Sequence, residues 1–238
     1  MANLYFKFKK FTVWHDKCAM KVGTDGVLLG AWTQVRNAST ALDIGTGTGL
    51  ISLMLAQRNS NIAITAVDVD SDAAWQAKEN VSSSLFVERI EVKHASFQEF
   101  IIDKKEAYDV IVSNPPYFQD SLLSPFAKRN VARHTISFSL PEMLRLSKQA
   151  LKPEGRVSLI LPYNEKKALE AIADDLEWEI IRQTTVFPTA NSLPKRLLTE
   201  LALLPQGNKI EDELIIENQR HQYSKEFVEL VKDFYLYL

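Results

Sequence analysis

The stretch Asp43-Ile44-Gly45-Thr46-Gly47-Thr48-Gly49-Leu50 overlaps the end of a short apolar run, residues 41–44, and leads into a helical pattern over residues 50–58. The apolar run has the length and composition of a buried parallel strand. Glycines at alternate positions let the backbone turn tightly and approach a ligand closely, and the helix after them presents its first N–H groups to that ligand. The stretch therefore predicts a ligand site between a strand and a helix of an α/β fold.

Outward from this loop, apolar runs alternate with helical patterns. The runs are short and rich in valine and isoleucine, as buried parallel strands are, and they cover residues 41–44, 62–69, 90–92, 108–113 and 157–161. The helical patterns cover residues 50–58, 72–81 and 140–151. The last of these begins at a capping box, Ser139 with Glu142, and ends before Pro153 and Gly155. This alternation predicts a doubly wound, mostly parallel sheet with helices on both faces.

Beyond residue 161 the sequence continues with a helical run over 165–176, strand-like runs over 179–187 and 196–204, and a closing helix over 225–235. We expect residues 1–38 to form an N-terminal cap segment, with an apolar helical run at 27–32, and residues 39–238 to form the main domain. No repeat, low-complexity tract or Gly/Ser linker divides the chain, so one compact domain is expected overall.

The composition, with 46% apolar and 24% charged residues, is that of a globular protein, and the net charge of −2 differs from the basic balance of a general nucleic-acid binder. Basic residues gather only locally, as in the five lysines among residues 1–21. The first twenty residues are too charged for a signal peptide, and no apolar stretch is long enough to span a membrane. A single cysteine, Cys18, excludes an internal disulfide and a multi-cysteine metal site. We therefore expect a cytoplasmic protein without a bound metal.

The glycine stretch is not a dinucleotide-binding fingerprint, because Leu50 stands where that pattern requires its third glycine. NAD and FAD are therefore disfavoured. Asp43 lies within the turn, where it would repel a pyrophosphate but could hold a cationic amino group, directly or through water. Gly45 and Gly47 would bring the backbone close to the same ligand.

The ends of the second and third strands carry further candidate ligand contacts. Asp68 ends the second strand, and a carboxylate at that place can accept hydrogen bonds from both hydroxyls of a ribose. Ser96 and Phe97 follow the third strand, where the serine could meet an adenine ring and the phenylalanine could pack on it. Because the carboxyl ends of parallel strands form the ligand edge of such a sheet, we expect these residues to share one site.

The fourth strand ends in the most specific string of the chain, Ser113-Asn114-Pro115-Pro116-Tyr117. Consecutive prolines have fixed φ and no N–H, so the backbone after Asn114 is rigid and offers carbonyls without competing donors. An exocyclic NH2 group can donate its hydrogens to the Asn114 side-chain oxygen and the Pro115 carbonyl, which turns its lone pair toward a methyl donor. Tyr117 supplies a flat face on which a base can stack. The string predicts chemistry on an exocyclic amino nitrogen.

The strings DIGTGTGL and NPPY, with Asp68 between them, resemble those of class I methyltransferases that act on amino groups. The flanks narrow this resemblance, because KVGTDGVLLGAW at residues 21–32, Pro194-Lys195-Arg196 and the terminal YSKEFVELVKDFYL are similar to those of bacterial tRNA(Val) adenine-37 N6-methyltransferases. The likeness runs over nearly the whole chain. It implies a seven-stranded sheet with the last strand antiparallel, S-adenosylmethionine as the methyl donor, and the adenine next to the valine anticodon as the target.

The resemblance also implies roles for residues of this chain. The cofactor site would comprise Lys21, Thr24, Asp43, Gly45, Gly47, Asp68, Ser96, Phe97 and Asn114. The target-base site would comprise Asn114, Pro115, Pro116 and Tyr117. One departure concerns Ser96, because members of this family often carry an acid near that position to meet the adenine amino group of the cofactor.

The expected partner is the anticodon loop of a tRNA, from which the target base must be flipped out because a stacked base cannot present its N6 to a pocket. For the RNA phosphates we nominate the N-terminal lysines together with Lys128, Arg129, Arg133, Lys195 and Arg196. The sequence leaves the oligomeric state undetermined.

Other functions compete with this interpretation. Enzymes that methylate a release-factor glutamine carry a longer domain before the glycine loop, and DNA adenine methyltransferases usually carry a target-recognition domain, so neither fits. A ribosomal RNA guanine N2-methyltransferase stays open as an alternative. A non-catalytic module that only binds the cofactor would predict a damaged glycine loop or NPPY string, whereas both are intact here.

Overall fold

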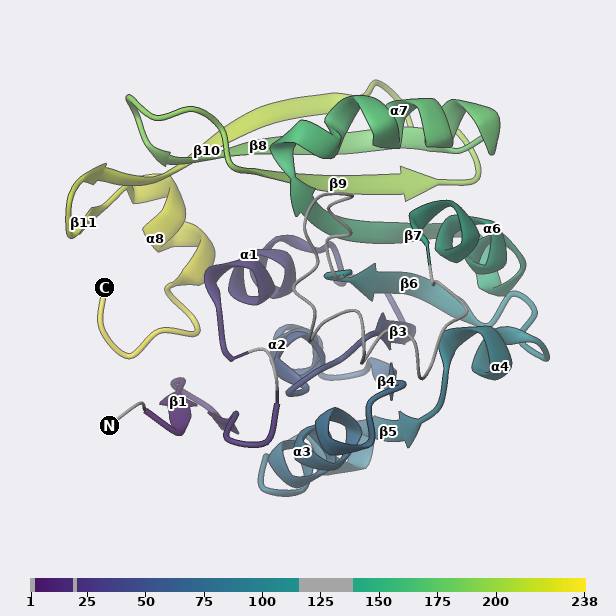
Figure 1. The fold of residues 1–238 in the computed structure, drawn as a ribbon, viewed down its shortest axis with the longest axis horizontal. Helices are drawn as coiled ribbons and strands as arrows, with labels where there is room; N and C mark the ends of the chain where they lie inside the picture. The colour runs from purple at the N-terminus through teal and green to yellow at the C-terminus, as the bar shows by residue number, and fades with distance from the viewer. Residues whose placement is uncertain (1–2, 19–20, 116–138) are drawn as a thin grey trace, which may run out of the picture.

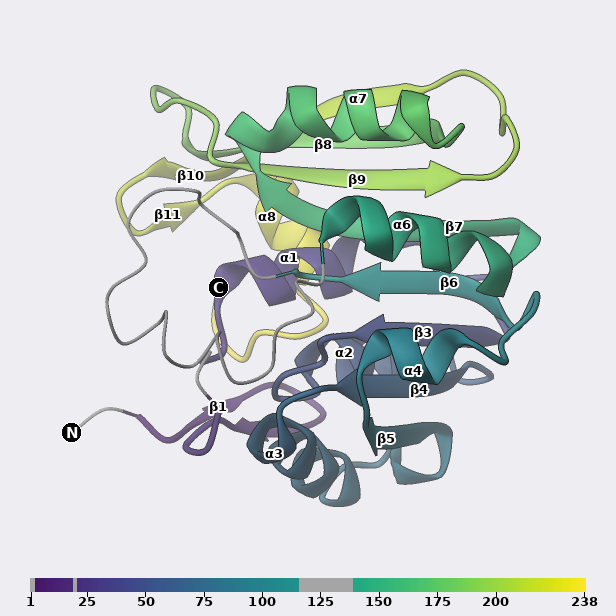
Figure 2. The same cartoon turned by 45° about the vertical axis from the view of Figure 1, so that its right-hand side comes forward.

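The computed structural model of the chain describes residues 3–18, 21–115 and 139–238. At its centre is a nine-stranded sheet with the order β11-β10-β8-β9-β7-β6-β3-β4-β5, and helices cover both of its faces (Figures 1 and 2). The strands that the sequence predicted are β3 (Thr40–Ile44), β4 (Ala63–Asp68), β5 (Ile90–His94), β6 (Tyr108–Ser113), β7 (Leu151–Pro162), β8 (Glu179–Thr189) and β9 (Arg196–Ala202). The predicted class, a mostly parallel α/β sheet, is confirmed.

The edge of the sheet beyond β8 differs from the expectation of seven strands. Strand β9 is antiparallel to both of its neighbours, as the resemblance implied for the last strand. Two further strands follow it in the chain: β10 (Ile210–Gln219) lies parallel to β8, and β11 (Gln222–Tyr223) lies antiparallel to β10. The sequence did not predict β10, because four acidic residues interrupt its apolar pattern and leave most of its side chains exposed.

The helices agree closely with the predicted patterns. They are α1 (Thr24–Trp32), α2 (Leu50–Arg58), α3 (Ser71–Ser82), α6 (Leu140–Ala150), α7 (Lys166–Asp175) and α8 (Lys225–Val231). A short helix that the sequence did not predict, α4 (Phe97–Ile101), follows β5. The predicted cap of α6 is present, since Ser139 Oγ accepts a hydrogen bond from the backbone N–H of Glu142. Across the described ranges, none of the helices has the length and apolar character needed to cross a membrane.

Each face of the sheet packs against its own apolar core. One core joins α1, α2 and α8 to the sheet, and the other joins α4, α6 and α7 to the opposite face. Helix α1 is buried along almost its whole length. It also lies very close to α2, because a Cβ added at Gly30 would stand 2.8 Å from the Sδ atom of Met54. The apolar helical run at residues 27–32, which was expected in the N-terminal cap segment, therefore belongs to the core that packs on the sheet.

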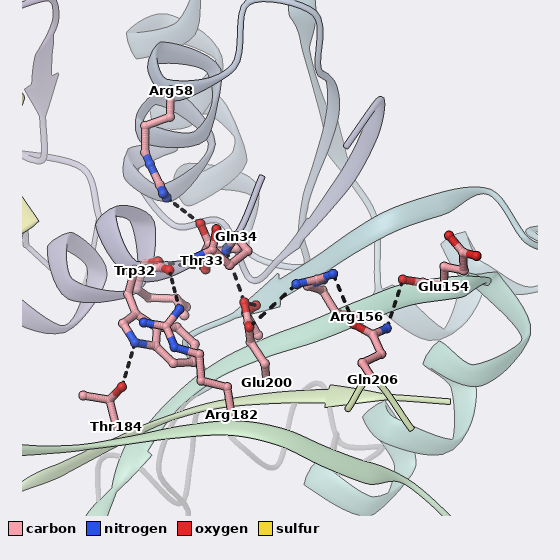
Figure 3. A network of polar contacts seen from close by, with 12 residues as sticks. Trp32, Thr33, Gln34, Arg58, Glu154, Arg156, Arg182, Thr184, Glu200 and Gln206 are labelled. Carbon is pink, nitrogen blue, oxygen red and sulfur yellow. Dashed lines mark hydrogen bonds and ion pairs between the residues drawn. The ribbon is translucent and has the colours of Figure 1, made fainter. Parts of the chain in front are cut away.

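A polar network fixes the carboxyl end of α1 to the sheet (Figure 3). The buried carboxylate of Glu200, on β9, accepts hydrogen bonds from the Gln34 backbone N–H at 3.1 Å and from Ser158 Oγ at 3.2 Å. Trp32 Nε1 donates to Thr184 Oγ1 at 2.8 Å. The Arg182 guanidinium lies 4.1 Å from the centre of the Trp32 ring. Helix α1 is thus held on the sheet by directional bonds as well as by apolar packing.

An antiparallel hairpin of β1 (Tyr5–Lys7) and β2 (Thr12–Trp14) precedes α1 and forms a separate two-stranded sheet. Its inner side chains, Phe8 and Val13, belong to the same core as α1 and α2. In Figure 2 the hairpin lies on the side of the molecule toward which the arrowheads of β3 and β6 point. The first described residues are therefore packed beside the carboxyl edge of the sheet.

Candidate functional site

The loop between β3 and α2 has the backbone shape that its glycines allow. Gly45, Gly47 and Gly49 have φ angles of 69°, 58° and 79°, a left-handed conformation that other residues rarely adopt. A Cβ added at Gly45 or Gly47 would meet no atom within 4 Å, so open space lies beside both residues. A ligand could therefore approach this backbone closely, as the sequence predicted.

Asp43, at the end of β3, lies completely buried beneath this loop. Its Oδ2 accepts hydrogen bonds from Thr46 Oγ1 and Ser52 Oγ, each at 2.7 Å. Its Oδ1 has no hydrogen-bond partner among the described residues. Burial raises the pKa of the Asp43 carboxyl to about 6. The observed contacts of the carboxylate therefore hold the loop in its shape. Its predicted contact with a cationic group of a ligand stays a prediction.

Asp68, at the end of β4, is a second carboxylate that holds the glycine loop in place. Its Oδ2 accepts a hydrogen bond from the backbone N–H of Gly47 at 2.8 Å, and its Oδ1 accepts one from the backbone N–H of Asp70 at 2.9 Å. Burial raises the pKa of the Asp68 carboxyl. Each carboxylate oxygen can accept a second hydrogen bond, so the proposed bonds to a ribose are compatible with these contacts.

Ser96 and Phe97 have local structural roles. Ser96 caps α4, since its Oγ accepts a hydrogen bond from the Glu99 backbone N–H at 3.2 Å and donates one to Glu99 Oε2 at 2.8 Å. Phe97 is buried in the core beneath α4. The adenine contacts predicted for these residues stay predictions, and the contact from Ser96 requires its hydroxyl to leave the Glu99 carboxylate.

Asn114 and Pro115 follow β6 directly, next to the glycine loop. Ser113 Oγ donates a hydrogen bond to the carbonyl of Ile44 at 2.9 Å, which ties the ends of β6 and β3 together. Asn114 and the glycine loop thereby share the carboxyl edge of the sheet, as the sequence predicted. The predicted target-base residues Pro116 and Tyr117 and the predicted RNA contacts Lys128, Arg129 and Arg133 lie outside the described residues.

A cavity of about 560 Å³ opens at this edge. It is lined by residues of the glycine loop, the segment that leads into α1, and the neighbouring strand ends. Seven of the predicted site residues are in its lining: Lys21, Thr24, Gly45, Gly47, Asn114, Lys195 and Arg196. The structure therefore brings together residues that are more than a hundred positions apart in the sequence.

Asp25 is a cavity residue that sequence reasoning did not select. Its Oδ2 accepts a hydrogen bond from Arg196 Nε at 2.8 Å, and the two side chains form an ion pair. Arg196 was predicted to bind RNA phosphates, but its charge is opposed by this carboxylate, whereas the neighbouring Lys195 is exposed. Nothing local in the sequence signals the pair, because the two residues are 171 positions apart.

The cavity lining also contains apolar residues of the outer strands that were not predicted as site residues. Val186 and Pro188 come from β8, and Ile216 comes from β10. Ile216 reaches the cavity because β10 lies beside β8 in the sheet. The Leu214-Ile215-Ile216 run was the available signal for this strand.

Among the residues that the structure describes, no group of three His, Cys, Asp or Glu side chains could hold a metal ion.

Comparison with known families connects this geometry to a class of enzyme. Residues 20–180 match the family model described as the methyltransferase small domain. A protein of Parabacteroides distasonis named tRNA1(Val) (adenine(37)-N6)-methyltransferase is 53% identical over 99% of each chain. A protein of the same name from Bacteroides thetaiotaomicron is 47% identical over the full length of both chains.

Solved structures with similar folds are more distant in sequence. A predicted O-methyltransferase of Agrobacterium tumefaciens superimposes with a TM-score of 0.67 at 17% identity, over 88% of this chain and 96% of the other. A SAM-dependent methyltransferase of Aquifex aeolicus superimposes with a TM-score of 0.51 at 17% identity, over 72% of this chain and 85% of the other. At this identity the two structures support the fold alone.

Proposed function

Because the chain belongs to the tRNA1(Val) (adenine(37)-N6)-methyltransferase family, we propose that it transfers a methyl group from S-adenosylmethionine to the exocyclic N6 of adenine 37 in tRNA(Val). The observation that carries this proposal is the shared cavity, whose lining includes Gly45 and Gly47 of the glycine loop together with Asn114. Groups suited to a methyl donor thus stand beside groups suited to an amino acceptor. We place the reaction in the cytoplasm, where tRNA is used in translation.

The residues of the glycine loop fit the proposed donor. The loop leaves open space beside Gly45 and Gly47, and a buried carboxylate oxygen of Asp43 beneath it lacks a hydrogen-bond partner among the described residues. Asp68 stands at the strand end where a carboxylate can bind ribose hydroxyls. When bound, S-adenosylmethionine supplies an electrophilic methyl group. Negative charge from Asp43 would favour the cationic part of such a ligand.

Asn114 and Pro115 would act on the acceptor. An exocyclic amino group on adenine is a poor nucleophile because its lone pair delocalises into the ring. If the Asn114 side-chain oxygen and the Pro115 carbonyl accept its two hydrogens, the nitrogen is held with its lone pair directed toward the methyl donor. As the N–C bond forms, the bond between the methyl group and the sulfur of the donor would break, S-adenosylhomocysteine would be the leaving group, and the nitrogen would lose its surplus proton to water. These groups therefore orient the acceptor, and fixed orientation is a large part of the rate that an enzyme can provide.

The proposed substrate is a base taken out of its stack. An anticodon loop offers such a base at low cost, because it lies outside a continuous duplex. Pro116 and Tyr117, which lie outside the described residues, are proposed to form the wall against which the base stacks. Exposed Lys195, at the rim of the cavity, is proposed to hold an RNA phosphate.

Methylation of defined RNA transcripts tests this function. Purified protein with labelled donor should methylate a tRNA(Val) transcript, and nucleoside mass spectrometry should identify N6-methyladenosine. A transcript with guanine at position 37 should receive no label. Methylation of guanine, or faster methylation of duplex DNA than of tRNA(Val), would contradict the proposal. The Asn114→Ala variant serves as the matched protein control.

A further inference from the structure

The outer face of the N-terminal hairpin carries two large aromatic side chains that the core does not use. Tyr5 pairs with Trp14 across the two strands, and their ring centroids lie 4.9 Å apart. Tyr5 is 41% exposed and Trp14 is 44% exposed. Lys7, two residues after Tyr5 and therefore on the same face of the strand, is also exposed.

The opposite face of the hairpin supplies the packing that holds it in place. Val13 and Phe8 are buried, and the Phe8 ring stacks on Phe11 with centroids 4.7 Å apart. The Phe6 ring lies 5.7 Å from that of Tyr235. Because this inner face already anchors the hairpin, burial in the core does not account for the aromatic pair on the outer face.

A buried amide ties the hairpin to the glycine loop. Asn80 Oδ1 accepts a hydrogen bond from the Trp14 backbone N–H at 2.9 Å, and Asn80 Nδ2 donates to the Trp14 carbonyl at 2.8 Å. The same Nδ2 donates to the carbonyl of Thr48, within the glycine loop, at 2.9 Å. One side chain therefore fixes the strand that carries Trp14 relative to the proposed donor site. Figure 2 shows the hairpin on the side of the sheet where the cavity-forming strands end.

The hairpin segment that carries the aromatic pair, residues 3–14, contains three lysines and no acidic residue, in a chain whose net charge is −2. Lys7 and Lys10 are exposed. Lys17, just after β2, is already engaged, because its Nζ lies 3.0 Å from the centre of the Trp75 ring and 3.9 Å from Glu79 Oε2. Exposed rings among cations are the combination with which proteins bind unpaired nucleotides, since the rings stack on bases while the cations attract phosphates.

We propose that the outer face of the hairpin, with Tyr5, Trp14 and Lys7, is a stacking surface for unpaired RNA bases that flank the target adenine. This inference rests on the proposed function, because the RNA must enter the cavity beside the glycine loop. It adds a second contact to the substrate, separate from the pocket that takes the target base. A bound loop would then be held on two sides, by the hairpin and by the cavity rim.

Tryptophan fluorescence gives a direct reading of this surface. The chain has four tryptophans, of which Trp32 and Trp178 are only 3% and 4% exposed, so quenching by RNA reports on Trp14 and Trp75. In a Trp75→Phe variant, Trp14 is the exposed reporter. An RNA hairpin with the anticodon stem and loop of valine tRNA should quench this signal at saturation. A fully paired RNA duplex of equal length should not, because it offers no unpaired base.

Affinity measurements on hairpin variants give the second reading. The Tyr5→Ala/Trp14→Ala variant should bind the same RNA hairpin about 5- to 100-fold more weakly, as expected for the loss of stacking on one base. Its affinity for S-adenosylmethionine should stay within twofold of the wild-type value. The Tyr5→Phe/Trp14→Phe variant keeps both rings and should bind RNA like the wild type. Tyr223→Ala, which removes a ring of equal exposure (41%) on β11, serves as the control.

Two results would overturn the proposal: wild-type RNA affinity in the folded Tyr5→Ala/Trp14→Ala variant, or no quenching of Trp14 by the RNA hairpin at saturation. The quenching test needs no alteration of the aromatic pair, so it decides the question even if the double variant does not fold. Failure of the proposed function would look different. A wild-type protein that binds the RNA hairpin through Trp14 but does not methylate it would refute the methyl transfer and retain the stacking surface.

Discussion

Arg196 Nε donates a hydrogen bond to Asp25 Oδ2 over 2.8 Å, and this contact joins the first residue of β9 to the first turn of α1 across the cavity. The exposed Lys195 beside it projects from the same strand end. Adjacent cations that look equivalent in the sequence are therefore different, because one is paired with a carboxylate and the other is exposed.

The first prediction separates these two cations. Lys195→Ala should lower the dependence of RNA affinity on salt by about one unit of slope, as expected for the loss of one phosphate contact. Arg196→Ala should lower it less, because the Arg196 charge is already opposed by Asp25. Binding titrations at several salt concentrations measure both slopes. Equal reductions in the two variants would show that Arg196 contacts a phosphate as strongly as Lys195.

The second prediction concerns the buried carboxyl of Asp43. Its pKa in the folded protein is about 6, above the ordinary value of 3.8. Between these two values the folded state binds more protons than the unfolded state, so this residue makes the protein less stable as the pH rises through that window. Above pH 6 the full cost, about 3 kcal/mol, remains.

Asp43→Asn removes that cost while keeping an oxygen that can accept from Thr46 and Ser52. The stability of the variant relative to the wild type should rise by up to about 3 kcal/mol between pH 4 and neutral pH. Urea unfolding of both proteins at several pH values measures it. A stability difference that is independent of pH would contradict the prediction. Affinity for S-adenosylmethionine should fall in the same variant, because the negative charge beneath the loop is lost.

The third prediction assigns Asp68 to the donor site. Asp68→Ala should weaken binding of S-adenosylmethionine, because charge-assisted hydrogen bonds are lost that contribute about 1.5 to 3 kcal/mol each. Isothermal titration calorimetry measures the affinity. Asp70→Ala is the control, since Asp70 caps α3 by accepting from the N–H groups of Asp72 and Ala73. It should lower stability by about 0.5 to 2 kcal/mol and leave donor affinity unchanged. Equal donor affinity in the folded Asp68→Ala variant would remove Asp68 from the site.

The fourth prediction assigns Asn114 to the acceptor. Asn114→Ala should slow methyl transfer by about 100-fold, far more than it weakens donor binding, because the main role of the side chain is to orient the acceptor amino group. Single-turnover transfer to tRNA(Val), with donor affinity measured in parallel, separates the two effects. Transfer at the wild-type rate would rule out the proposed role.

The fifth prediction concerns the network at the far end of α1 (Figure 3). Glu200→Ala leaves the buried donors of Gln34 and Ser158 without their acceptor and removes the ion pair with Arg156. We expect a loss of about 2 to 4 kcal/mol in the free energy of unfolding. Chemical denaturation measures it, with Glu154→Ala as the control because that side chain is exposed. A loss below 0.5 kcal/mol, the range of ordinary surface substitutions, would show that the network contributes little.

The sequence by itself determined the elements whose signals are local. The residues of α2 and β6 coincide with the predicted ranges, and Ser139 caps α6 as its spacing to Glu142 indicated. The glycine loop also follows from the sequence, because only glycine adopts positive φ without steric cost. Asn114 and the glycine loop could be placed at one edge because parallel strands in this kind of sheet end on the same side.

Only the tertiary structure decided which of the candidate residues meet and what each of them already binds. Arg196 finds Asp25, Ser96 is bound to Glu99, and the Asp43 carboxylate is enclosed beneath its own loop. These contacts depend on strand order, register and burial, which bring together residues far apart in the chain. A local sequence pattern indicates whether a segment is a helix or a strand and where that segment ends. It does not indicate which distant residues the folded chain will place in contact with it.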